Sequence, residues 1–156
     1  MSAEAVLKAA RKTGLKIATA ESCTGGMVSA ALTGVAGSSD VFERGFVTYS
    51  NDAKMQMLGV RAKTLATYGA VSEETAREMA TGALQHSHAT LSVSVTGIAG
   101  PGPSEHKPEG RVCFAVAREN RVTTTETVEF GPLGRAEVRA ASCAHALELL
   151  RLAASP

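Results

Sequence analysis

Residues 17–26 read IATAESCTGG, and the rest of the chain is organised around this stretch. The short apolar run at 17–20 is followed by an acid, a hydroxyl, a thiol and a second hydroxyl. Two glycines and an Ala-rich helical pattern at 27–32 come next. A strand that breaks into a small-residue turn and opens a helix can present a reactive side chain beside bare amide N–H groups. The stretch therefore predicts a strand, a functional turn and a helix.

Strand and helix patterns alternate on either side of this turn. Strands are expected at 15–20, 41–49 and 91–95, followed by a hairpin at 111–117 and 122–130. Helices are expected at 3–12, 27–32, 61–68, 135–152, just after the Ser50-Asn51-Asp52 capping cluster and again after Ser72. This order predicts an α/β fold, a three-layer α/β/α sandwich with a mixed sheet in which parallel first strands are joined by the C-terminal hairpin. At 156 residues, we expect a single domain over 1–156.

Two helices carry the clearest signals. Ser72 is the expected N-cap of its helix, with Glu73 and Glu74 in the first turn against the positive end of the dipole. In the last helix, apolar residues at every third position predict the inward face. These residues are Val138, Ala141, Ala144, Leu147 and Leu150.

Composition excludes several classes of protein. Apolar residues make up 44% of the chain and charged residues 20%, values that fit neither a disordered nor a membrane protein. A formal net charge of +1, aromatic residues at 4% and the absence of Trp argue against a nucleic-acid partner. The three cysteines are widely spaced and the N-terminus carries no signal-peptide pattern, so we expect a cytoplasmic protein.

The predicted topology has a functional consequence. The carboxyl ends of parallel strands share one edge of a sheet, and sites in open α/β sheets gather there. Ser22 follows the first strand, Tyr49 and Lys54 follow the second, and Thr96 follows the third. We therefore expect these four residues to meet at one place.

Ser22 is a candidate nucleophile, which needs a base to activate it. None of the four histidines falls at the predicted edge with a recognisable acidic partner, whereas Lys54 does fall there. Lysine can replace histidine in such a pair if desolvation keeps it neutral. A solvated surface lysine is the alternative interpretation. Cys23 is the rival nucleophile, although a small buried residue is the simpler interpretation of it.

Two small-residue loops could bind an anion. Thr24-Gly25-Gly26 offers N–H groups at a helix start, which suit a phosphate or an oxyanion. The loop at 96–102 adds a second cradle, and together the loops favour a nucleotide-like ligand. Arg135 and Arg139 lie one helical turn apart and could clamp a phosphate.

Four motifs in order resemble the CinA carboxy-terminal domain family, the nicotinamide mononucleotide (NMN) deamidases also called PncC. The motifs are ATAESCTGG at 18–26, the run from Phe42 to Lys54 that contains VTYSN, GAVSEETAREMA at 69–80 and TGIAGP at 96–101. The resemblance covers nearly the whole chain. It implies hydrolysis of the carboxamide of NMN to nicotinate mononucleotide and ammonia by a Ser/Lys mechanism, without a cofactor or metal.

The resemblance also implies roles for individual residues. Ser22 is the implied nucleophile, Lys54 its base and Tyr49 a supporting group. The implied substrate-binding residues are Thr24, Gly25, Gly26, Asn51, Thr96, Gly97, Gly100 and Arg135 or Arg139. The implied partner is a small-molecule nucleotide substrate, with no nucleic acid or membrane, and we expect a homo-oligomer.

One segment departs from the family pattern, which is richer in glycine after TGIAGP. Here the chain reads Gly102-Pro103-Ser104-Glu105-His106. Proline removes an N–H donor that glycine would keep, so substrate contacts could differ at this point. Two alternatives to the enzyme are a nucleotide-binding or regulatory module that retains the cleft without catalysis, and a DNA-uptake accessory protein, against which the near-neutral charge speaks.

Overall fold

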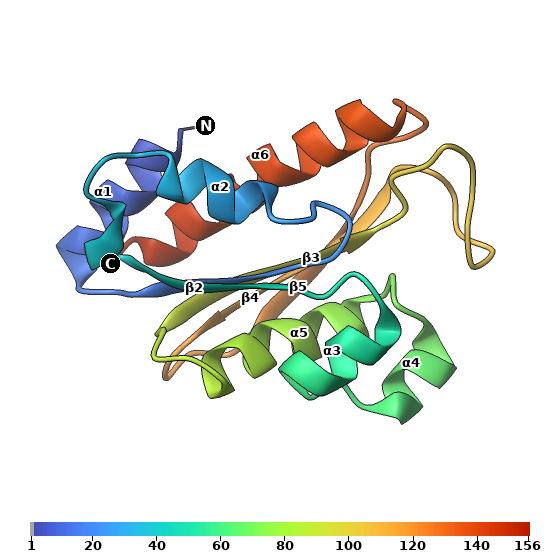
Figure 1. The fold of residues 1–156 in the computed structure, drawn as a ribbon, viewed down its shortest axis with the longest axis horizontal. Helices are drawn as coiled ribbons and strands as arrows, with labels where there is room; N and C mark the ends of the chain where they lie inside the picture. The colour runs from blue at the N-terminus through green and yellow to red at the C-terminus, as the bar shows by residue number, and fades with distance from the viewer. Residues whose placement is uncertain (1) are drawn as a thin grey trace.

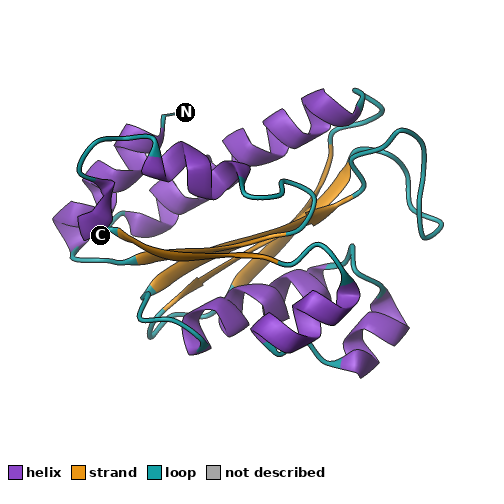
Figure 2. Ribbon diagram, in the orientation of Figure 1, coloured by secondary structure: helices purple, strands orange, loops and turns teal. Residues whose placement is uncertain are grey.

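In the computed structural model, which describes residues 2–156, a five-stranded sheet lies between two layers of helices (Figure 1). The strands are β1 (Ile17–Glu21), β2 (Phe42–Val47), β3 (Leu91–Gly97), β4 (Arg111–Arg118) and β5 (Thr124–Glu129). The helices are α1 (Ala3–Thr13), α2 (Met27–Thr33), the 3-10 turn η1 (Ser38–Asp40), α3 (Asn51–Leu58), α4 (Ala62–Tyr68), α5 (Glu73–Gln85) and α6 (Arg135–Ala154). Helices α1, α2 and α6 cover one face of the sheet, and α3, α4 and α5 cover the other (Figure 2).

The sheet has the order β2-β1-β3-β4-β5. β1 pairs in parallel with both β2 and β3, while β3–β4 and β4–β5 are antiparallel. Glu21, the last residue of β1, lies opposite Val47 and Val95. The predicted three-layer sandwich with a mixed sheet is confirmed, and the three parallel strands end at one common edge.

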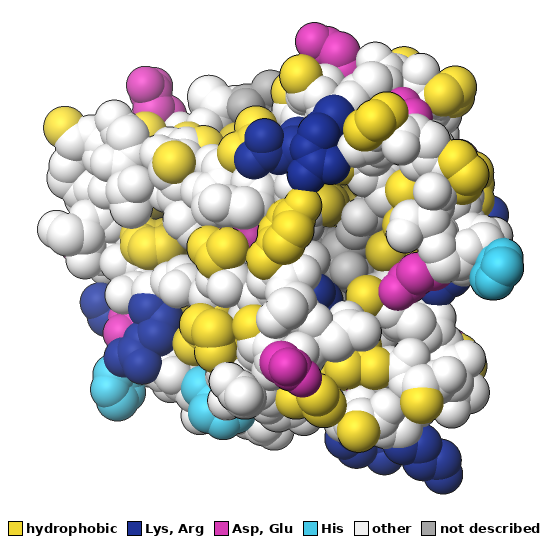
Figure 3. All heavy atoms as spheres, turned by 45° about the vertical axis from the view of Figure 1, so that its right-hand side comes forward, with side chains coloured by type: hydrophobic (Ala, Val, Ile, Leu, Met, Phe, Trp, Pro, Cys, Tyr) yellow, Lys and Arg dark blue, Asp and Glu magenta, His cyan; other side chains and the backbone are white. Residues whose placement is uncertain are grey.

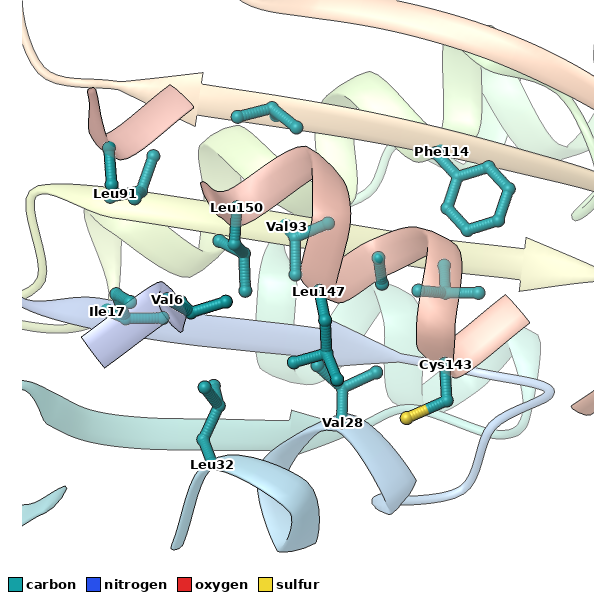
Figure 4. Close-up of a cluster of buried hydrophobic side chains, with 14 of the residues drawn as sticks. Val6, Ile17, Val28, Leu32, Leu91, Val93, Phe114, Cys143, Leu147 and Leu150 are labelled. Atoms are coloured by element: carbon teal, nitrogen blue, oxygen red, sulfur yellow. The ribbon is translucent and has the colours of Figure 1, made fainter. Parts of the chain in front are cut away.

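Each face of the sheet has its own core. Between the sheet and α1, α2 and α6, branched apolar residues interdigitate around Phe114, Leu147 and Leu150 (Figure 4). On the opposite face the residues are smaller. Gly82 of α5 lies so close to α3 that an added Cβ would stand 2.0 Å from the backbone oxygen of Leu58. Helix α3 is therefore held tightly against α5, which fixes the position of the side chains that α3 carries toward the sheet edge.

Two helix starts agree with the predicted caps. The side chains of Ser50 and Ser72 accept hydrogen bonds from the amides of Ala53 and Thr75, at 3.0 and 3.1 Å. Gly14 ends α1 in the left-handed conformation, with φ of 69°. These local signals depend on neighbours in the chain, so sequence reasoning could find them.

The predicted inward face of the last helix is partly wrong, because Ala144 is exposed. A step of three residues turns a helix by only about 300°, so a strict three-residue repeat drifts off the buried face. The observed stripe follows the 3.6-residue period instead. It consists of Val138, Ser142, Cys143, Ala146, Leu147, Leu150 and Ala154.

In residues 2–156, no helix combines the length and hydropathy that a membrane span requires.

Candidate active site

A cleft of about 490 Å³ opens at the carboxyl ends of the parallel strands. Segments from all three strand ends meet there, as the topology predicted. The lining consists of Ser22, Cys23, Tyr49, Asn51, Lys54, Ala70, Val71, residues 96–105 and Arg135. Figure 3, which turns the right-hand side of Figure 1 toward the viewer, shows the surface hollowed between the upper and lower layers, with basic and acidic side chains interspersed around it.

Lys54 and Ser22 meet at the floor of this cleft. The Nζ of Lys54 donates a hydrogen bond to Oγ of Ser22 at 2.9 Å and a second to the backbone oxygen of Thr48 at 2.8 Å. Ser50 starts α3 one turn before Lys54 and thereby aims the lysine back toward β1. The Lys54 side chain is not solvated, because the residue is only 1% exposed.

Burial changes the protonation of this lysine. Desolvation disfavours the charged ammonium and lowers the pKa of Lys54 to about 8, against the smaller opposing effects of Cys23 and Glu105. A substantial fraction of the amine is therefore neutral near physiological pH. A neutral amine within hydrogen-bond distance of a serine hydroxyl can accept its proton.

Cys23 lies beside Ser22, but its surroundings disfavour the charged form of its side chain. It is 5% exposed, and desolvation by burial raises the pKa of its thiol to about 11. The thiolate is the reactive form of cysteine, so this environment suppresses its nucleophilicity. The geometry favours Ser22 as the attacking group.

Thr24, Gly25 and Gly26 form the turn between β1 and α2, but they do not line the cleft. Thr24 is fully buried and donates its hydroxyl to Glu21 at 2.6 Å. Gly25 and Gly26 have φ of 57° and 107°, a backbone region that glycine adopts without strain. The amide of Gly25 already donates to the backbone oxygen of Ser22 at 3.0 Å.

The two candidate arginines have different surroundings. Arg139 donates from Nε to the backbone oxygen of Cys23 at 3.0 Å and does not line the cleft. Arg135 does line it, and its guanidinium bridges the oxygen of Gly100 and the hydroxyl of Tyr49, both at 2.7 Å. Only Arg135 therefore presents its charge toward a molecule in the cleft.

The remaining predicted binding residues lie on the cleft wall. Asn51 is exposed at the start of α3. The hydroxyl proton of Thr96 is already engaged, since it is donated to the backbone oxygen of Ala70 at 2.8 Å. Gly97 and Gly100 expose backbone on the same wall. Tyr49 is 61% exposed and its hydroxyl contacts Arg135.

Sequence reasoning missed two acidic residues. Glu105 lines the cleft within the segment that departs from the family pattern, and its charge acts on Lys54. Glu21 is fully buried at the end of β1. Their positions depend on tertiary structure, although the acid immediately before Ser22 was a signal that could have drawn attention to Glu21.

Neither histidine nor a metal cluster contributes to the described part of the site. No histidine lines the cleft, and His145 pairs with Glu126 away from it. Within residues 2–156, no three or more His, Cys, Asp or Glu side chains are arranged to hold a metal ion.

The fold, with its serine at the end of the first strand, places the protein in a known class. The chain belongs to the CinA C-terminal domain family, which matches residues 1–154. Among curated relatives, the nicotinamide-nucleotide amidohydrolase PncC of Escherichia coli strain K12 is 51% identical over 150 residues, covering 94% of this chain and 89% of the relative. A CinA-like protein of Chloroherpeton thalassium is 60% identical over 105 residues, 67% of this chain.

The alignment with the Chloroherpeton protein covers 25% of that longer relative, so this chain corresponds to one part of it. Solved structures agree with the fold. The competence/damage inducible protein CihA of Agrobacterium tumefaciens has a TM-score of 0.87 at 49% identity, covering 96% of this chain and 95% of that one. A competence or damage-inducible protein of Enterobacter asburiae has a TM-score of 0.93 at 34% identity, with coverage of 98% and 96%. The predicted family is thereby confirmed.

Proposed function

We propose that this chain is a nicotinamide-nucleotide amidohydrolase, which hydrolyses the carboxamide of NMN to nicotinate mononucleotide and ammonia. The observation that carries the proposal is the hydrogen bond between Lys54 Nζ and Ser22 Oγ inside the cleft. The name of the Escherichia coli relative, whose similarity extends over nearly the whole chain, supports the substrate. We further propose that residues 1–156 act as one domain.

In the proposed mechanism, neutral Lys54 accepts the proton of Ser22 as Oγ attacks the carboxamide carbon. The tetrahedral intermediate collapses, the C–N bond breaks, and protonated Lys54 gives its proton to the leaving ammonia. The nicotinoyl group is then esterified to Ser22. Lys54, neutral again, accepts a proton from water as water attacks the ester, and it returns that proton to Ser22 Oγ when nicotinate mononucleotide leaves.

The cleft also suggests how the substrate is held. We assign the phosphate to Arg135, because this guanidinium lines the cleft and Arg139 does not. The hydroxyl of Tyr49 accepts a hydrogen bond from Arg135 and thereby helps to hold this guanidinium at the cleft. The loop at 96–100 lies beside Ser22 and offers backbone to the developing oxyanion.

Ammonia release from NMN by the purified protein tests this function. Wild type should release ammonia, and Ser22→Ala and Lys54→Ala should lose nearly all of the activity. Lys63→Ala, which removes an exposed lysine of α4, is the matched control and should retain full activity. Wild type that binds NMN without turnover would instead establish the alternative, a nucleotide-binding or regulatory module.

We also propose that the protein forms a homo-oligomer and lies in the cytoplasm. A homo-oligomer is supported by the open edges of β2 and β5 and by the exposed side chains Val47 and Val122, and light scattering after size-exclusion chromatography tests it. A cytoplasmic location is supported by the three free, buried cysteines, which suit a reducing compartment, and fractionation of cells tests it.

A further inference from the structure

We propose that Glu21 is a positioning residue that fixes Ser22 and Lys54 relative to each other. The inference rests on the proposed amidohydrolase function and adds a residue to it. Glu21 touches neither Ser22 Oγ nor the cleft, so its effect on the reaction is indirect. Its carboxylate and its backbone oxygen hold different parts of the site.

The carboxylate of Glu21 is fully buried and accepts four hydrogen bonds. Oε1 accepts from the hydroxyl of Thr24 at 2.6 Å and from the amide of Val28 at 2.9 Å. Oε2 accepts from the amide and hydroxyl of Ser29, at 3.0 and 2.8 Å. A buried carboxylate destabilises a fold unless its oxygens are satisfied, and here both oxygens are.

These donors tie the turn after β1 to the first turn of α2. Gly26, the N-cap of α2, has no side chain, and Val28 and Ser29 carry two of the helix amides that lack an intrahelical acceptor. Glu21 supplies the missing acceptor from the strand before the turn. The five residues of the Ser22–Gly26 turn are thus closed into a loop, which restricts how Ser22 can move.

The backbone of Glu21 holds the other half of the pair. Its carbonyl oxygen accepts from the amide of Thr48 at 2.8 Å, and the oxygen of Thr48 accepts from Lys54 Nζ at 2.8 Å. Lys54 Nζ in turn donates to Ser22, the residue joined to Glu21 by a peptide bond. The contacts form a closed ring that contains Glu21, Thr48, Lys54 and Ser22, and therefore both members of the pair.

Only a glutamate satisfies this arrangement. Each carboxylate oxygen accepts from one backbone N–H, so glutamine would direct its NH₂ group at an amide donor on one side. Aspartate is shorter by one C–C bond and cannot span the same donors from the β1 backbone. Glu21→Gln is therefore the sharpest substitution, because it keeps shape and volume while breaking one side of the network.

Kinetics of Glu21→Gln test the proposal, with Glu78→Gln as the matched control. Glu78 likewise holds the start of a helix, accepting from the amide of Arg61 and the hydroxyl of Thr64, but it lies away from the cleft. We expect kcat of Glu21→Gln to fall about 10- to 100-fold with KM changed less than about twofold, since small misplacement of a nucleophile has effects of this order. Glu78→Gln should lower the melting temperature and leave kcat unchanged.

A second readout separates positioning from mere stability and does not depend on NMN. The rate at which a fluorophosphonate probe labels Ser22 should fall in parallel with kcat in folded Glu21→Gln protein. Labelling and kcat equal to wild type would overturn the proposal. Failure of wild type to hydrolyse NMN would count against the proposed function alone, because probe labelling still reports on Ser22.

If Glu21→Gln does not fold, Thr24→Val and Ser29→Ala provide the test. Each removes one hydroxyl donor to the carboxylate and leaves the backbone bonds in place. We expect a loss of about two- to tenfold in probe labelling for each variant. Two folded variants that both label at the wild-type rate would refute the positioning role.

Discussion

The Nζ of Lys54 lies 2.9 Å from the Oγ of Ser22, although the two residues are 32 positions apart in the chain. The lysine is buried and its pKa is lowered to about 8 by desolvation. If Lys54 is the base, kcat/KM for NMN should rise with pH through about 8 as the amine loses its proton, and then level off. A pH–rate profile measures this directly. A flat profile from about pH 6 to about pH 9.5, the range in which the lysine titrates, would exclude Lys54 as the titrating base.

The same pKa has a consequence for stability. Lys54 binds its proton more weakly in the folded protein than in the unfolded chain, where the ordinary value is 10.5. The burial cost is therefore fully present below pH 8 and is relieved as the pH rises from about 8 to 10.5. Over this window the free energy of unfolding of wild type should rise by up to about 3 kcal/mol relative to Lys54→Met.

Denaturant unfolding of both proteins across that window measures the difference. The variant serves as the control because it keeps every other titrating group. Parallel curves for wild type and Lys54→Met would show that the pKa of Lys54 is the same in the folded and unfolded states, and would contradict the pKa shift.

Glu105 tunes the lysine from the cleft wall. Its negative charge raises the pKa of Lys54, against the larger lowering effect of burial. Glu105→Gln should therefore shift the rising limb of the pH–rate profile to lower pH. Glu119→Gln, at the exposed hairpin turn after β4, should leave the limb in place. A shift to higher pH in Glu105→Gln would contradict this electrostatic assignment.

Cys23 should be dispensable for the reaction. Because burial raises the pKa of its thiol to about 11, little thiolate forms at neutral pH. Cys23→Ala should keep kcat within about threefold, at a cost in stability of order 1 kcal/mol for the lost packing, whereas Ser22→Ala should lose at least about 10²-fold. Steady-state ammonia release distinguishes the two, and the reverse pattern would make Cys23 the nucleophile.

Substitutions of Arg135 and Arg139 should change different kinetic parameters. Arg135→Ala should raise KM for NMN about tenfold or more. The same substitution should change KM for nicotinamide riboside, which lacks the phosphate, much less. Arg139→Ala removes the bond to the oxygen of Cys23, so it should lower the melting temperature and kcat rather than raise KM. If Arg139→Ala alone raised KM for NMN, the phosphate assignment would pass to that residue.

The local signals in the chain were sufficient for the framework of the fold. Ser50 and Ser72 cap helices where predicted, and the alternation of strands and helices fixed a mixed sheet whose parallel strands end together. The topology rule then placed Ser22 and Lys54 at one edge. Each of these inferences rests on propensities and periodicities that act between residues close together in the chain.

The tertiary structure decided what those residues can do. Periodicity could not show that Lys54 is buried, because its desolvation comes from segments after β1, β2 and β3 that meet only in the folded chain. It also ended the first strand at residue 20, whereas β1 includes Glu21, whose buried carboxylate accepts four hydrogen bonds. Charge and hydrogen bonding between distant segments depend on three-dimensional proximity, so the sequence alone determined where the site lies, and the packing determined its protonation and its geometry.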